Sequence, residues 1–136
     1  QLCGKEAMPY WLSVDVNVIK QIKIEKDQDP SVVELKIQNQ VSEIANNGQY
    51  AVLDSHKQGH LGGTGETFNW EIARQISPKY DFLLAGGLSP DNVGEAISTA
   101  NPWGVDVSSG VETDGVKDKE KIISFINQVR LIDCRL

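Results

Sequence analysis

Short apolar runs alternate with longer stretches of helical periodicity along this chain. Val16 to Ile24 alternates apolar and polar residues, which is typical of a strand. Tyr50 to Asp54 and Phe82 to Ala85 are compact, mainly apolar runs that predict buried strands, and Trp103 to Val107 repeats this pattern. The sequence therefore predicts strands over these four segments.

Apolar residues at helical spacing predict helices before, between and after these strands. Asn46-Asn47-Gly48 supplies a C-terminal stop for one of them. Ser89 and Pro90 are expected as the N-cap and the first residue of another helix. The helices are expected over Glu6 to Ser13, Ser31 to Ala45, Thr67 to Ile76, Ser89 to Thr99 and Lys117 to Arg130.

This order of elements is the signature of βα units around a parallel sheet, in which chemistry lies at the carboxyl ends of the strands. A (β/α)8 barrel usually binds phosphate in the loops after its last two strands. The expected fold is therefore α/β, the C-terminal part (about strands 4/5 to 8) of a (β/α)8 barrel. A doubly wound sheet is the alternative, but its phosphate fingerprint normally lies in the first βα turn.

The last two predicted strands run directly into glycine and serine. Gly86 and Gly87 follow one strand, and Ser108, Ser109 and Gly110 follow the next. Glycine lets the backbone approach an anion closely, and the start of a helix points unpaired N–H groups at it. The sequence thus predicts a bound phosphorylated molecule. A tight turn at the glycines and ordinary capping by the serines remain alternatives.

The composition narrows the choice of ligands. The chain has 136 residues and a formal net charge of -6, without a run of lysine and arginine, which argues against nucleic acid. A small anionic metabolite remains compatible. No stretch approaches the roughly 20 apolar residues of a membrane span, and there is no signal-peptide pattern, so we expect no membrane association and a cytoplasmic protein.

The remaining reactive and aromatic side chains are assigned to structural roles. Cys3 and Cys134 are expected to be ordinary reduced thiols. His56 and His60 lack carboxylate or cysteine neighbours at metal-ligand spacing, so they are expected in solvent and no metal is predicted. Packing roles are expected for Trp11, Trp70 and Trp103.

Several motifs occur in an order and spacing that, taken together, are very specific. They cover roughly residues 50 to 130 and comprise Leu53-Asp54-Ser55, Gly62-Gly63-Thr64-Gly65 with Phe68-Asn69-Trp70, Leu84-Ala85-Gly86-Gly87-Leu88 with Pro90, Asn92 and Val93, and Gly104 to Glu112. The chain thereby resembles the C-terminal half of the phosphoribosylanthranilate isomerase family. Gln1 to Gly4 resembles the end of the family's fourth strand, with Cys3 where histidine is usual, and Gly110 to Asp118 resembles fungal members.

The resemblance implies an Amadori rearrangement without a cofactor: N-(5-phosphoribosyl)anthranilate becomes 1-(2-carboxyphenylamino)-1-deoxyribulose 5-phosphate in L-tryptophan biosynthesis. It implies that Asp54 is the general acid. The base in the family is a cysteine on the first strand, which precedes this chain, so a missing N-terminal barrel half (strands 1 to 3) is expected as a partner. The alternative is a non-catalytic phosphate-binding half-barrel in which Asp54 only caps a loop.

The resemblance also assigns the remaining site residues. Gly86, Gly87, Ser108, Ser109 and Gly110 are expected to hold the phosphate. Asp106 is expected to face the sugar hydroxyls, although a buried aspartate bonded to backbone is the alternative. A mobile loop that covers the site is expected at Gly62, Gly63, Thr64 and Gly65, with a surface loop of no such role as the alternative.

The first residues, 1–4, read as the end of a strand, so we expect the chain to be part of something larger, with a barrel domain over 1–130 and a tail over 131–136. An open piece of barrel leaves sheet edges unpaired and apolar surface exposed. We therefore predict that the chain expressed alone aggregates, dimerises or stays molten. A sharp cooperative melt of a dilute monomer would contradict this prediction.

Overall fold

The computed structural model describes residues 1–24, 30–54 and 66–133, and every structural statement below concerns these ranges. In chain order the elements are α1 (Met8–Leu12), β1 (Ile19–Lys23), α2 (Pro30–Asn46), β2 (Tyr50–Asp54), α3 (Glu66–Ile76), β3 (Phe82–Ala85), α4 (Val93–Ala100), β4 (Gly104–Val105), the 3-10 helix η1 (Ser109–Val111), β5 (Glu112–Thr113), β6 (Val116–Lys117) and α5 (Lys119–Asp133).

Strands β1, β2, β3 and β4 form one sheet in sequence order, and every neighbouring pair is parallel. The N-terminal segment extends this sheet at the β1 edge. Leu2 donates its N–H to the carbonyl of Ile19 (2.8 Å) and accepts the N–H of Gln21 (2.9 Å). The expectation that the first residues form the end of a strand is therefore confirmed.

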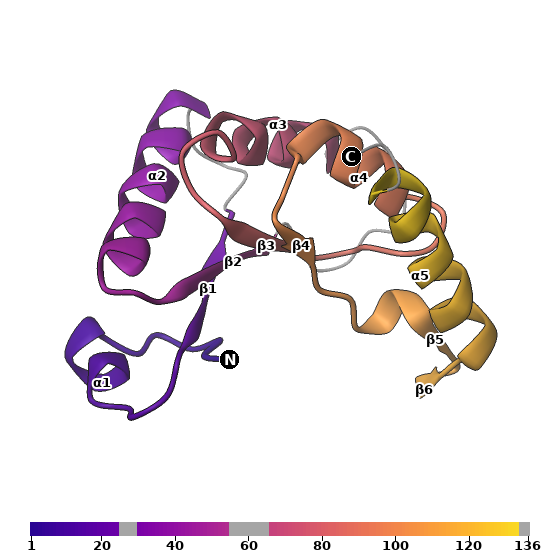
Figure 1. Cartoon of the computed structure of the whole chain (residues 1–136), viewed down its shortest axis with the longest axis horizontal. Helices are drawn as coiled ribbons and strands as arrows, with labels where there is room; N and C mark the ends of the chain where they lie inside the picture. Colours follow the sequence, from indigo (N-terminus) through magenta and orange to yellow (C-terminus); the bar gives the residue numbers. More distant parts are fainter. Residues whose placement is uncertain (25–29, 55–65, 134–136) are drawn as a thin grey trace.

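Helices α2, α3, α4 and α5 follow one another in an arc along the outer side of the sheet (Figure 1). A doubly wound sheet would instead reverse its strand order and carry helices on both faces. The sequential order and the one-sided helix layer therefore favour the barrel type of βα arrangement. In the described ranges no helix is both long and apolar enough to span a bilayer.

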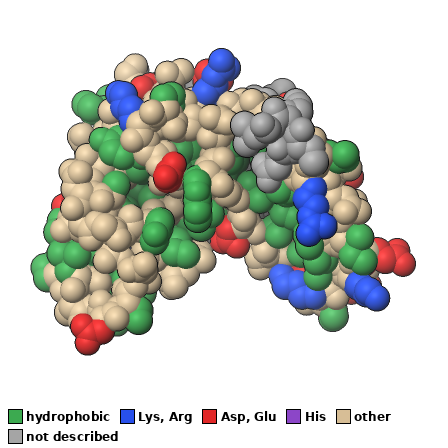
Figure 2. Space-filling model, viewed as in Figure 1, with side chains coloured by type: hydrophobic (Ala, Val, Ile, Leu, Met, Phe, Trp, Pro, Cys, Tyr) green, Lys and Arg blue, Asp and Glu red, His purple; other side chains and the backbone are tan. Residues whose placement is uncertain are grey.

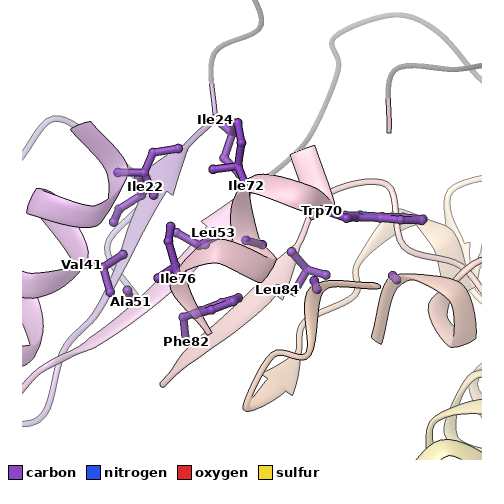
Figure 3. Close-up of a cluster of buried hydrophobic side chains, with 14 of the residues drawn as sticks. Ile22, Ile24, Val41, Ala51, Leu53, Trp70, Ile72, Ile76, Phe82 and Leu84 are labelled. Carbon is purple, nitrogen blue, oxygen red and sulfur yellow. The ribbon is translucent and has the colours of Figure 1, made fainter. Parts of the chain in front are cut away.

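The main core lies between the sheet and this helix layer, because alternate strand residues point toward the helices. Leu53, Phe82 and Leu84 are almost fully buried there, against Val41 and Ile76 of the helices (Figure 3). Trp11 and Trp70 are buried. Trp103 packs at the surface: it is 66% exposed and stacks on Tyr50 with ring centroids 6.2 Å apart.

Two helices begin later than the sequence predicts, because polar side chains stabilise turns in front of them. Ser89 is not the N-cap of α4: its N–H donates to the side-chain oxygen of Asn92 (2.8 Å), and α4 begins at Val93. Lys117 lies in β6, so α5 begins at Lys119. This helix runs to Asp133, beyond its expected end at residue 130, and the division into domain and tail stays a prediction.

Asp118 connects the β5–β6 hairpin to the start of α5. One carboxylate oxygen accepts the Thr113 hydroxyl (2.7 Å), and the other accepts the N–H groups of Glu120 (2.9 Å) and Lys121 (3.3 Å). The Thr113 hydroxyl first, and then these backbone N–H groups, hold the pKa of Asp118 below its ordinary value, because they stabilise the charged carboxylate. The hairpin is thereby fixed against α5.

A core position and an exposed position should respond differently to the same truncation. Leu53 is fully buried, whereas Leu35 on α2 is 60% exposed. We expect Leu53→Ala to lower the free energy of unfolding by about 2–5 kcal/mol, because it leaves a cavity in the core. Leu35→Ala should change it by about 0.5 kcal/mol or less. Urea denaturation checks both, and equal losses would contradict this position of the core.

Candidate functional site

A cavity of about 270 Å³ lies at the carboxyl ends of β2, β3 and β4. Because these strands are parallel and in register, the residues that follow them meet at one edge of the sheet. The cavity therefore collects residues far apart in sequence. They are Gln1, Gln21, Asp54, Ala85, Gly86, Gly87, Leu88, Asp106, Val107, Ser108, Ser109 and Gly110.

Asp54 is the last residue of β2 and lies opposite Lys23 on β1 and Ala85 on β3. It is half-buried and lines the cavity. Gln21, two residues before Lys23 and therefore on the same face of β1, donates its side-chain amide to the Asp54 carboxylate. This contact fixes the carboxylate at the cavity wall.

The glycine pair after β3 has a backbone conformation that other residues rarely adopt. Gly86 has φ 90° and Gly87 has φ 67°. A Cβ at Gly87 would meet nothing within 4 Å, so the left-handed backbone, and not lack of space, requires glycine there. The side-chain amide of Asn92 donates to the carbonyl of Gly87 (2.9 Å) and fixes the turn.

Gly110 joins the second loop to the first. A Cβ at this position would lie 1.7 Å from the carbonyl oxygen of Leu88, so only glycine allows the two loops to touch. The contact brings residues 108–110 beside the glycine pair. Gly110 is the middle residue of the 3-10 helix η1.

Asp106 follows β4 and donates its backbone N–H to the carbonyl of Leu84 (2.9 Å). Its carboxylate lies 3.5 Å from the side-chain amide of Gln1 and is half-buried at the cavity wall. Asp106 is therefore accessible to a ligand, unlike the buried aspartate of the alternative reading.

The charge of the cavity is unusual for an anion site. Two carboxylates, Asp54 and Asp106, line it, and its described lining includes neither lysine nor arginine. Binding of an anion there would rest on backbone N–H groups and on the hydroxyls of Ser108 and Ser109. No group of histidine, cysteine or acidic residues suited to a metal occurs in the part of the chain that the structure describes.

The structure brings together most of the predicted site. Asp54, the glycine pair, Asp106 and residues 108–110 all line this cavity. The predicted loop residues Gly62, Gly63, Thr64 and Gly65 lie outside the described residues, as do His56, His60 and Cys134. The lining residues that were not predicted as part of the site are Gln1, Gln21, Ala85, Leu88 and Val107. For Gln21, the alternation along β1 offered a signal, since it shares the face of residue 23 at the strand's carboxyl end.

The family model of N-(5'phosphoribosyl)anthranilate (PRA) isomerase matches residues 1–128. The chain belongs to the PRA isomerase family. The chain is 41% identical to the PRA isomerase of Dehalococcoides mccartyi over 133 residues. This match covers 98% of this chain and 60% of the relative. The chain thus spans about 60% of the length of this relative. The relatives named here are bacterial, and the fungal likeness of residues 110–118 stays a prediction.

Solved PRA isomerase structures share the fold. The enzyme from Thermotoga maritima matches with a TM-score of 0.72 and 30% identity, over 93% of this chain and 58% of that one. A further PRA isomerase, described in complex with reduced 1-(o-carboxyphenylamino)-1-deoxyribulose 5-phosphate, matches with a TM-score of 0.68 and 25% identity, over 93% of this chain and 56% of that one. The parallel α/β arrangement predicted from the sequence is therefore confirmed.

The contact between the two loops predicts that replacing Gly110 with alanine is destabilising, whereas the same change at a glycine outside the contact is not. Gly110→Ala should lower the free energy of unfolding by about 1–3 kcal/mol or more, because the methyl group collides with the Leu88 carbonyl. Gly94→Ala, inside α4, meets only Ile132 at 3.7 Å and should raise it by up to about 1 kcal/mol. Chemical denaturation of both variants checks this, and a neutral Gly110→Ala would contradict the contact.

Proposed function

We propose that this chain supplies the general acid and the phosphate cradle of a PRA isomerase. The reaction is the rearrangement of N-(5-phosphoribosyl)anthranilate to 1-(2-carboxyphenylamino)-1-deoxyribulose 5-phosphate in L-tryptophan biosynthesis. The observation that carries the proposal is the meeting of Asp54 and two glycine-containing loops at one cavity, in a chain of this family. The reaction uses no cofactor, and we expect it in the cytoplasm.

Asp54 is the proposed acid. Ring opening breaks the bond between C1 and the furanose oxygen, and the oxygen must gain a proton as the electron pair moves to it. Ring opening leaves a protonated imine, because the nitrogen keeps its hydrogen as the C=N bond forms. This cation then loses the proton on C2 to a base and becomes a neutral enolamine, which tautomerises to the ketone. Asp54 lies at the cavity wall and is held by Gln21, which suits the first of these proton transfers.

The two loops are the proposed phosphate site. Gly86, Gly87, Ser108, Ser109 and Gly110 offer N–H and hydroxyl donors on one side of the cavity. Asp106 would then face the sugar hydroxyls, and Gly62, Gly63, Thr64 and Gly65 would cover the substrate. The related enzyme described with a reduced 5-phosphate product supports a phosphate ligand for this family.

The proposed base, a cysteine on the first strand, lies on the N-terminal half of the barrel. The chain matches about 60% of the length of its relative, and Leu2 pairs at the β1 edge as a fourth strand would. We therefore propose that the chain forms about strands 4/5 to 8 of a (β/α)8 barrel and acts with strands 1 to 3. The second candidate is a phosphate-binding half-barrel without the base.

Turnover in the presence of the N-terminal half tests this function. We expect the chain mixed with the N-terminal half of the Dehalococcoides relative to isomerise fluorescent phosphoribosylanthranilate, and the chain alone to be inactive. Asp54→Asn should lower turnover by about 10²–10⁴-fold, because it removes the proton donor.

The matched control is Asp81→Asn, the same change at an exposed residue just before β3, which should leave turnover unaltered. Equal activity of Asp54→Asn and the unaltered chain would contradict the role of Asp54. Phosphate binding without turnover in the mixture would favour the half-barrel without catalysis.

A further inference from the structure

The described lining of the cavity contains no cationic side chain, although the proposed ligand is an anion. A phosphate monoester carries a charge of about -1.5 to -2 near neutral pH. The described lining holds two acidic residues, Asp54 and Asp106, and neither lysine nor arginine. A cation close behind the lining would strengthen the binding of a phosphate, because opposite charges attract.

Lys117 occupies such a place. Its ammonium donates to the backbone carbonyl of Ser108 (2.9 Å) and, at 3.4 Å, to the Ser108 hydroxyl oxygen. Ser108 is a lining residue of the cavity, whereas Lys117 is not. Lys117 therefore contacts the phosphate loop from its outer side.

The β5–β6 hairpin holds Lys117 there. Glu112 and Lys117 are opposite each other in the hairpin, and their side chains form an ion pair of 2.6 Å. The Lys121 ammonium donates to the carbonyl of Glu112 (2.6 Å) and ties this pair to α5. Basic side chains lie over this end of the molecule in Figure 2. The contacts with Ser108 and Glu112 thus fix the position of the Lys117 side chain.

The chemistry of the ammonium group decides which atom donates in the hydrogen bond between Lys117 and Ser108. An ammonium group has three donors and no acceptor, so the Ser108 oxygen must accept in its contact with Lys117. The single hydroxyl proton is then left for another acceptor. This geometry favours an anion in the cavity as that acceptor. The Lys117 ammonium on the other side of the hydroxyl would polarise the O–H bond and strengthen the hydrogen bond to the anion.

We propose that Lys117 is a positioning residue of the phosphate site, which orients Ser108 as a donor to the phosphoryl group and polarises the Ser108 hydroxyl. This inference rests on the proposed phosphate cradle. It adds a residue from outside the cavity, and the residue acts through Ser108 without touching the ligand.

A double-mutant cycle on Lys117 and Ser108 tests the inference, with ribose 5-phosphate titrated by calorimetry into the 136-residue chain assembled with the N-terminal half of the Dehalococcoides relative. Lys117→Met should weaken binding about tenfold, since a charge-assisted contact is lost. In the Ser108→Ala background the same change should weaken it only about twofold, because the hydroxyl through which the charge acts is absent. Lys117→Arg should restore binding to within about threefold of the unaltered chain.

Lys119→Met is the matched control, because it removes the same charge from an exposed position two residues away and should change binding less than about twofold. Should circular dichroism show that Lys117→Met is unfolded, Lys117→Gln takes its place in the cycle. Additive effects of Lys117→Met and Ser108→Ala, or unaltered binding by Lys117→Met, would overturn the role of Lys117 and leave the phosphate cradle standing. Absence of binding by the unaltered chain in this assembly would overturn the phosphate cradle as well.

Discussion

The parallel register of β2, β3 and β4 is the constraint on which the site depends. Asp54 lies opposite Ala85, and Leu84 lies opposite Val105, so the residues that follow each strand reach the same edge of the sheet. A slip of one residue would turn Asp54 toward the helices and bury a carboxylate in the core. The burial of Leu53 and Leu84 under the helix layer prevents such a slip, so the hydrophobic core also sets the geometry of the site.

Contacts outside the sheet hold the two loops that follow β3 and β4 in place. Gly110 lies against the Leu88 carbonyl and holds the two loops together, while Asn92 and Lys117 fix one loop each through the carbonyls of Gly87 and Ser108. The loops thus have little freedom before a ligand arrives. A preorganised set of donors loses less entropy when it binds an anion, which suits a cavity with two carboxylates in its wall.

The sequence was sufficient for the order of elements and for most of the site, because buried strands and amphipathic helices leave strong periodic patterns. It was insufficient where a specific side-chain contact decides the outcome. The capture of Ser89 by Asn92 delays α4, and the pairing of Lys117 with Glu112 delays α5. The exposure of Trp103 and the bond from Gln21 to Asp54 likewise depend on neighbouring strands, which local patterns do not encode.

The most direct test of this site is a crystal structure of the chain, assembled with an N-terminal half, in complex with the reduced 5-phosphate product. We expect the phosphate between the glycine pair and residues 108–110, with the Ser108 hydroxyl donating to it and Asp54 facing the sugar. A phosphate bound elsewhere, or a sugar turned away from Asp54, would contradict the assignment of acid and phosphate cradle to this one cavity.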